Sequence, residues 1–255
     1  MNYFMGIDIG SAYSKGVITK DSQLLAYHVI PSGANYGTAA NIIKGELLKK
    51  SNLSQDDIAE VVATGTGAGN VAFAARQASE MICTARGINH IFPQVKTAIE
   101  VAGQSSKVIK INERGMVTDF TVSEKCAAGS GRFIEVIANV LRIELKDFGP
   151  LSLKSKGPVS FGTGCAVFGE SEAVTRVAEG VPKEDIAAGV NLSLAGKISS
   201  LARKIKFEEP CAICGGGALN AGLIKAVEQE LHIRLLIPQQ PQIITALGAT
   251  AIAGT

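Results

Sequence analysis

The sequence has few of the residues that bind nucleic acids or anionic membranes. Of its 255 residues only 19% are charged and 5% aromatic, and the formal net charge is +2. No run of basic residues is longer than two or three. Because nucleic acids and anionic membranes are bound through clustered lysine and arginine, we expect neither as a partner.

Long apolar runs and a leader segment are lacking as well. The most apolar stretch, residues 243–253, is interrupted by Gly248 and is too short to cross a bilayer. The first predicted strand already contains Asp8 and no charged segment precedes it, so we expect no secretion signal. The five cysteines, an odd number, do not indicate a disulfide framework. We therefore expect a cytoplasmic protein whose cysteines serve packing, catalysis or metal ligation.

The sequence does have 46% hydrophobic residues and 28 glycines, which is typical of an α/β protein with many tight turns. Strand patterns followed by helical patterns occur in two rounds. The predicted strands cover residues 3–10, 15–19, 24–30, 58–64, 107–112, 115–121, 211–214 and 233–236. The predicted helices cover residues 38–50, 70–87, 93–102, 129–142, 166–179, 184–206, 219–230 and 241–253. This order predicts α/β architecture with two related halves.

A faint internal repeat supports the two halves. Residues 8–18 read DIGSAYSKGVI, and residues 100–109 read EVAGQSSKVI. Both segments place an acid, a glycine, hydroxyl groups and a lysine just before a β-branched strand. We therefore expect an internal duplication.

The first of these segments is suited to wrapping a polyphosphate. Gly10 lets the backbone approach, hydroxyl and backbone N–H groups donate to phosphate oxygens, and Lys15 supplies positive charge. Asp8 is placed to hold Mg²⁺ through water. The alternative is an ordinary hairpin with a polar tip. The GxxxxGK[ST] motif of P-loop proteins is lacking, and the turn GTGAGN at 65–70 does not complete a Rossmann motif.

A third glycine cluster, CGGGALN at residues 214–220, follows a short strand and opens a helix. A nucleotide can lie against bare backbone at such a helix N-terminus. Alone the cluster is only a glycine-rich turn, but two preceding phosphate hairpins make it more specific.

The segments GIDIGSAYSKGVI, AGQSSKVI and CGGGALNAGL occur in this order and resemble the phosphate-1, phosphate-2 and adenosine motifs of the actin, sugar-kinase and heat-shock-70 ATPases. The resemblance covers essentially the whole chain. It implies two ribonuclease-H-like domains with ATP in the cleft between them. The first domain would comprise residues 1–95 and 241–255, and the second residues 96–240.

Two cysteines, Cys126 in KCAAGSGRFIE and Cys165 in GTGCAVFGESEAV, each end a turn just before a helical pattern. A helix N-terminus favours the thiolate, the form that binds iron. A cubane cluster generally takes four cysteine ligands, which a two-fold dimer of this chain would supply. On the residues alone, two buried and inert cysteines are an equal alternative.

The remaining cysteines suggest packing. Cys211 and Cys214 form a CxxC pattern, which elsewhere indicates zinc or redox chemistry. In a strand, side chains three residues apart point to opposite faces, so we expect these two to fill the core. Cys83 lies in a helical pattern and is also expected to pack.

The segments CAAGSGRF and CAVFGESE strongly resemble the two cluster-binding segments of the ATP-dependent activators of 2-hydroxyacyl-CoA dehydratases, a family shared with benzoyl-CoA reductase ATPase subunits. The resemblance implies one [4Fe–4S] cluster per homodimer, held by Cys126 and Cys165 of both chains. It implies that ATP, with Mg²⁺, drives single low-potential electrons to a partner iron–sulfur protein. Ferredoxin or flavodoxin is the implied electron donor.

The resemblance also implies the nucleotide site. Asp8, Glu100 and Gln104 are the implied catalytic residues, with Gln104 orienting the attacking water or touching the γ-phosphate. The residues implied to bind ATP are Gly10, Ser11, Ala12, Tyr13, Ser14, Lys15, Gly103, Gln104, Glu135, Gly215, Gly216, Gly217 and Gln242. Among these, Glu135 is expected to reach the ribose.

Three departures from the family pattern limit the match. The phosphate-2 segment usually reads DIGGQDSK, so Glu100 carries its charge on a longer arm and Ser105 lacks a carboxylate. The aromatic-plus-arginine pattern expected after ATG is replaced by TGAGN, and Cys214 is an addition before the three glycines. They suggest a divergent branch, one that serves a double-cubane cluster protein related to the dehydratases. Two alternatives stay open, an iron-free sugar or acid kinase and an ATP-binding module that senses redox state through Cys126.

Overall fold

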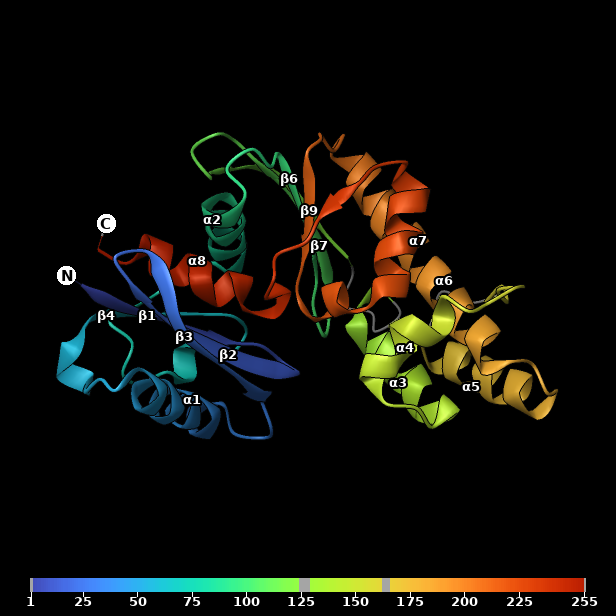
Figure 1. The fold of residues 1–255 in the computed structure, drawn as a ribbon, viewed down its shortest axis with the longest axis horizontal. Helices are drawn as coiled ribbons and strands as arrows, with labels where there is room; N and C mark the ends of the chain where they lie inside the picture. Colours follow the sequence, from blue (N-terminus) through green and yellow to red (C-terminus); the bar gives the residue numbers. More distant parts are fainter. Residues whose placement is uncertain (1, 124–128, 162–165, 255) are drawn as a thin grey trace. The chain divides into compact units, whose positions relative to one another are not determined.

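The computed structural model describes residues 2–123, 129–161 and 166–254 (Figure 1). Two five-stranded sheets are present, with the strand orders β3-β2-β1-β4-β5 and β10-β9-β6-β7-β8. The chain forms two compact units. The first unit comprises Met1–Ala98, Ile111–Thr118 and Pro238–Thr255, and the second Ile99–Lys110 and Asp119–Ile237. The domain boundaries expected from the sequence stay a prediction.

The first unit holds the first sheet and the C-terminal helix. Its strands are β1 Tyr3–Ile9, β2 Tyr13–Lys20, β3 Gln23–Pro31, β4 Ile58–Thr64 and β5 Arg76–Gln77. Its helices are α1 Tyr36–Ser51, α2 Glu80–Ile91 and α8 Ile244–Ile252. Short 3₁₀ turns are η1 Gln55–Asp57, η2 Ala68–Asn70 and η5 Pro241–Ile243.

Strand β1 is buried on both faces, which explains its nearly continuous apolar sequence. Ile7 and Ile9 share a core with Ile43 of α1. On the alternate face, any Cβ at Gly6 would clash with the backbone of Ala246 in α8. A helix therefore packs against each face of β1.

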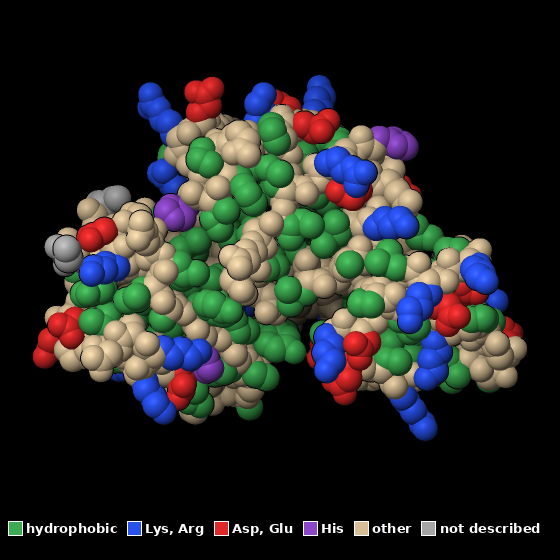
Figure 2. Space-filling view, in the orientation of Figure 1, with side chains coloured by type: hydrophobic (Ala, Val, Ile, Leu, Met, Phe, Trp, Pro, Cys, Tyr) green, Lys and Arg blue, Asp and Glu red, His purple; other side chains and the backbone are tan. Residues whose placement is uncertain are grey.

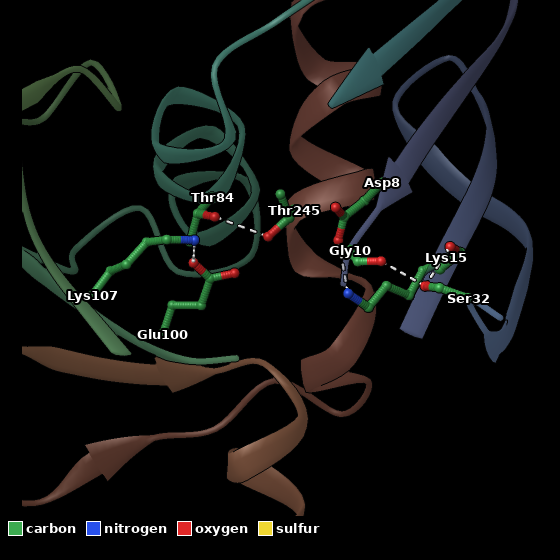
Figure 3. Close-up of polar contacts among 9 residues, drawn as sticks. Asp8, Gly10, Lys15, Ser32, Thr84, Glu100, Lys107 and Thr245 are labelled. Carbon is green, nitrogen blue, oxygen red and sulfur yellow. Dashed lines mark hydrogen bonds and ion pairs between the residues drawn. The ribbon is translucent and has the colours of Figure 1, made fainter. Parts of the chain in front are cut away.

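Helices α2 and α8 pack unusually closely because glycines lie at their contact. A Cβ at Gly248 would clash with the backbone of Cys83, and one at Gly87 with the backbone of Ile244. Within this contact the buried hydroxyl groups of Thr84 and Thr245 form a hydrogen bond of 2.9 Å (Figure 3). The close approach fixes α8 against α2 within the first unit.

The second unit holds most of the helices and the second sheet, apart from strand ends at residues 97–98, 111 and 117–118. Its strands are β6 Thr97–Val101, β7 Ser106–Ile111, β8 Val117–Val122, β9 Cys211–Cys214 and β10 Leu235–Leu236. Its helices are α3 Gly131–Leu141, α4 Leu145–Ser152, α5 Ala166–Ala178, α6 Lys183–Lys204 and α7 Ala221–Leu231, and η4 is Gly216–Leu219. Strand β9 is buried along its whole length, and its Cys211 and Cys214 are fully buried. Both cysteines therefore fill the core, as predicted.

One predicted helix is wrong, and another begins later than predicted. Residues 93–102 contain the strand β6, every residue of which is buried between β9 and β7. A short apolar run does not distinguish a strand from a buried helix, and the β-branched Thr97, Ile99 and Val101 decide for the strand here. The helix predicted over residues 70–87 is present only from Glu80, where α2 begins, and residues 71–79 are not helical. The helix α4 was not expected from the sequence.

No helix among the described residues is long and apolar enough to cross a membrane. On the face shown in Figure 2, acidic and basic side chains are interspersed. This mixture matches the small net charge of the chain.

Candidate nucleotide site

The first predicted phosphate hairpin is formed by β1 and β2. Asp8 and Lys15 are paired across the two antiparallel strands. Their side chains form an ion pair of 2.9 Å between Lys15 Nζ and Asp8 Oδ2, and Asp8 is only 2% exposed (Figure 3). The register of two adjacent strands therefore places a buried carboxylate beside a lysine, at the mouth of the turn that joins the strands.

A third strand holds the turn in place. Ser32, just after β3, donates a hydrogen bond of 2.6 Å from its Oγ to the carbonyl oxygen of Gly10. The same Oγ lies 2.8 Å from the Oγ of Ser14, and both serines are buried. Ser32 is a site residue that the sequence did not reveal, because only the return of β3 brings it to the hairpin.

The second carboxylate oxygen of Asp8 is an unusual feature of this hairpin. Oδ1 is buried and has no hydrogen-bond partner. Gly65, at a φ of +86° after β4, lies against this oxygen and could not carry a side chain there. An unsatisfied buried carboxylate oxygen is costly, so its position fits the binding of a cation or of a water bound to one.

The second predicted phosphate hairpin repeats this arrangement. Glu100 in β6 and Lys107 in β7 form an ion pair of 2.8 Å, with side chains 5% and 8% exposed (Figure 3). Gln104 lies exposed in the turn between these strands. Lys107 was visible in the sequence repeat as the counterpart of Lys15, although it was not among the predicted site residues.

The turn of this second hairpin is bonded to the start of α3. The N–H of Gly131 donates to the carbonyl oxygen of Ala102 at 2.9 Å, and Ser130 Oγ donates to that of Gly103 at 3.1 Å. In return, the buried Ser106 Oγ donates to the carbonyl oxygen of Gly129 at 2.7 Å. The phosphate-2 turn and the first turn of α3 therefore form one hydrogen-bonded unit.

The glycine turns after β4 and β9 correspond as closely as the hairpins do. Gly215 has a φ of +83°, and a Cβ there would clash with the backbone of Val101, as one at Gly65 would clash with Ile9. Gly67 and Gly217 approach the side chains of the same two residues, Ile9 and Val101. Together with the matching strand orders, this correspondence supports the duplication predicted from the sequence.

The chain matches a family of known proteins along nearly its whole length. The model of the BadF/BadG/BcrA/BcrD ATPase family matches residues 5–253.

The chain belongs to this ATPase family.

Two curated relatives are similar over their whole length. The chain is 38% identical to the 2-hydroxyisocaproyl-CoA dehydratase activator of Clostridioides difficile, covering 98% of this chain and 94% of that protein. It is 36% identical to the (R)-2-hydroxyglutaryl-CoA dehydratase activating ATPase of Acidaminococcus fermentans, covering 98% and 96%. The solved structure of the Clostridium difficile activator with bound ADPNP matches with a TM-score of 0.95, covering 98% of this chain and 94% of that chain.

A distant likeness shows the fold alone. A ROK family glucokinase from Streptomyces griseus matches with a TM-score of 0.59 at 15% identity, covering 99% of each chain. The predicted fold class, the predicted relation to dehydratase activators and the predicted ATPase class are confirmed.

The other predicted nucleotide-binding residues of this ATPase lie apart from the two hairpins in the sequence. Glu135 in α3 forms an ion pair of 2.9 Å with Arg132 at the surface of the second unit. Gln242 lies in η5 and is half-buried in the first unit. Their roles toward a nucleotide stay predictions.

The predicted cluster ligands Cys126 and Cys165 lie outside the described residues. The helices expected after them are present, with α3 beginning at Gly131 and α5 at Ala166. Within the described ranges, no three histidine, cysteine or acidic side chains are grouped so that they could hold a metal ion.

Proposed function

We propose that this chain is an ATP-dependent activator that passes single electrons to a 2-hydroxyacyl-CoA dehydratase or to a related double-cubane cluster protein. The observation that carries the proposal is the buried Asp8–Lys15 pair with its unpartnered Oδ1, in a chain whose relatives are named dehydratase activators. A related activator binds ADPNP, which supports ATP as the nucleotide.

In the first unit, the β1–β2 turn would hold phosphate oxygens. Backbone N–H and hydroxyl groups of residues 10–14 donate, and Lys15 supplies a positive charge that its partner Asp8 keeps in place. The unpartnered Oδ1 of Asp8 would accept a hydrogen bond from a water of a bound Mg²⁺, because Mg²⁺ keeps several of its waters when it binds phosphates.

In the second unit, Gln104 and the Glu100–Lys107 pair would face the terminal phosphate. The exposed side-chain amide of Gln104 can accept a hydrogen bond from the attacking water through its oxygen and donate one to a phosphate oxygen through its NH₂ group. Glu100 holds Lys107 in place, as Asp8 holds Lys15. The backbone of Gly215, Gly216 and Gly217 would contact the adenosine, with Glu135 and Gln242 near the ribose.

Cys126 and Cys165 are proposed to ligate one [4Fe–4S] cluster together with the same two cysteines of a second chain. Four thiolates are the donor set that such a cluster takes, and two chains with two cysteines each supply it. When bound, the cluster supplies a one-electron carrier. The helices α3 and α5 that follow the cysteines lie in the same unit as Gln104, so a nucleotide held there acts on the unit that carries the ligands.

The test is ATP-dependent activation of a dehydratase from the same organism. The protein, purified without oxygen and reduced, is mixed with the dehydratase and either Mg-ATP or no nucleotide. We expect dehydration of the 2-hydroxyacyl-CoA only with Mg-ATP and only after reduction. Iron-free protein that phosphorylates a hydroxyl substrate would contradict the proposal and favour a kinase.

A further inference from the structure

Three buried polar side chains meet behind the glycine turn at residues 215–219. They are Ser152 at the end of α4, Asn191 in α6 and Asn220, which follows η4 and caps α7. All three are less than 10% exposed. The helices α4, α6 and α7 lie side by side in the second unit (Figure 1). Polar groups at the contact of three helices are costly unless they satisfy one another.

These side chains do satisfy one another. The two asparagines exchange amide hydrogen bonds, with Asn220 Nδ2 donating to Asn191 Oδ1 at 2.9 Å and Asn191 Nδ2 donating to Asn220 Oδ1 at 3.4 Å. Asn191 Nδ2 also donates to Ser152 Oγ at 2.9 Å. Asn220 Oδ1 also accepts a hydrogen bond of 3.0 Å from the N–H of Leu223, and this bond makes Asn220 the N-terminal cap of α7.

Two glycines make room for this network. A Cβ at Gly222 would clash with Ser152 Oγ, and one at Gly149 would approach Asn220 Oδ1 to 2.7 Å. Ser152 Oγ in turn donates to the carbonyl oxygen of Gly149 at 2.7 Å. The backbones of α4 and α7 therefore come close enough for short polar side chains to connect them.

The duplicated turn in the first unit provides an internal comparison. Asn70 occupies the position there that Asn220 occupies after β9, since each asparagine comes five residues after a glycine of positive φ and three residues after a second glycine. Asn70, however, is exposed, and its amide donates to the carbonyl oxygen of Gly67 in its own turn at 3.3 Å. Of the two related turns, the one bonded to neighbouring helices is the one proposed to contact a nucleotide.

We infer that Asn191 and Ser152 are positioning residues for the adenosine part of the nucleotide. They act through Asn220, which fixes where the turn 215–219 ends and where α7 begins. On the other side, the close approach of Gly215 and Gly217 to Val101 holds the turn against β6. Held from both sides, the turn presents its backbone in one conformation, so little ordering is needed when a nucleoside binds. This inference rests on the proposed nucleotide site.

The test compares ATP with inorganic tripolyphosphate, which carries the phosphates without the nucleoside. The dissociation constant of ATP and the inhibition constant of tripolyphosphate against ATP hydrolysis are measured with Mg²⁺ on the full chain. For Asn191→Ala we expect ATP to bind about tenfold more weakly, the effect of one buried hydrogen bond. Tripolyphosphate should be unaffected within about twofold, and KM for ATP should rise while kcat is kept. Ser152→Ala should show the same selectivity with a smaller effect.

Two controls separate positioning from general stability. Leu194→Ala, also in α6 and fully buried, should lower the melting temperature without changing the ratio of the two constants. Asn70→Ala, in the related turn, should change neither constant. Equal weakening of ATP and tripolyphosphate by Asn191→Ala, or unchanged ATP affinity with a lowered melting temperature, would overturn the inference. Failure of the unsubstituted chain to bind ATP would overturn the proposed function and this inference with it.

Discussion

Asp8 combines burial, an ion pair and an unsatisfied oxygen in one side chain. Lys15 pairs with Oδ2, while Oδ1 faces Gly65 and has no partner. A structural ion pair alone would not require an unpartnered buried oxygen, since satisfied networks are the rule in protein interiors. The geometry therefore supports the proposed binding of a cation, or of a cation-bound water, at Asp8.

Asp8→Asn tests this explanation, because the amide keeps the size of the side chain and removes its charge. We expect kcat for ATP hydrolysis to fall at least tenfold and the Mg²⁺ concentration for half-maximal activity to rise. Steady-state hydrolysis in a Mg²⁺ titration measures both. Asp21→Asn, in the exposed turn between β2 and β3, is the control and should behave like the unsubstituted protein. Unchanged Mg²⁺ dependence in Asp8→Asn would contradict the assignment.

The buried Glu100–Lys107 pair should contribute to the stability of the second hairpin. Lys107→Met leaves the carboxylate of Glu100 buried without its lysine, which typically costs about 3 kcal/mol of unfolding free energy. Adding Glu100→Gln should recover part of this loss, because the uncompensated charge is gone. Urea unfolding of the single and double variants gives the comparison. If the double variant were less stable than Lys107→Met, the charge left on Glu100 would not be the cause of the lost stability.

At the scale of elements, the glycine turn after β9 depends on a conformation that only glycine adopts readily. Gly215→Ala would place a side chain at a φ of +83° and against the backbone of Val101. We expect the free energy of unfolding to fall by about 2 kcal/mol or more. Gly45→Ala, in the exposed interior of α1 with open space around it, should instead raise it by about 0.5–1 kcal/mol. Chemical denaturation measures the unfolding free energy of both variants. An unchanged value for Gly215→Ala would show that the turn does not require glycine at this position.

The segment that leaves α4 is held by the first turn of α6. Asp185 accepts hydrogen bonds from the hydroxyl of Ser155 at 2.6 Å and from the N–H groups of Lys156 and Gly157. These bonds, that of Ser155 first, lower the pKa of the Asp185 carboxyl below its ordinary 3.8. A lowered folded-state pKa means that the stabilisation is present above the unfolded pKa and is lost as the pH falls through the folded one.

The expected pKa shift of Asp185 can be measured directly by following its carboxyl carbon by NMR from pH 6 to pH 2. The midpoint should lie below 3.8 in the unsubstituted protein, because the ionised form accepts the three hydrogen bonds. In Ser155→Ala it should move up toward 3.8. A midpoint at or above 3.8 before substitution would show that these bonds do not favour the ionised form.

Local motifs were predicted better than elements that depend on tertiary contacts. The acid–glycine–lysine repeat predicted both hairpins because their chemistry is local in sequence. The strand β6 was misread because one of the two strands that bury it, β9, lies far along the chain. Ser32, Asn191 and Ser152 carried no motif, since each reaches its partners only after a distant element packs beside it.

For the whole molecule, the proposed function requires two chains to share one cluster. Cys165→Ala removes two of the four proposed ligands from a dimer, so iron should be lost and the dimer weakened. Cys211→Ala, which shortens a fully buried side chain in β9, is the matched control and should keep its iron. Iron analysis and light scattering on protein prepared without oxygen check both. A Cys165→Ala protein that keeps its full iron content would exclude this cysteine as a ligand.

Native mass spectrometry of protein purified without oxygen is the sharpest test of the shared cluster, because it counts chains and iron in one particle. We expect a species of two chains that carries a single cluster of four irons and four sulfides, and that takes up ATP with the cluster in place. Single chains, or dimers that contain no iron after anaerobic reconstitution with iron and sulfide, would contradict it.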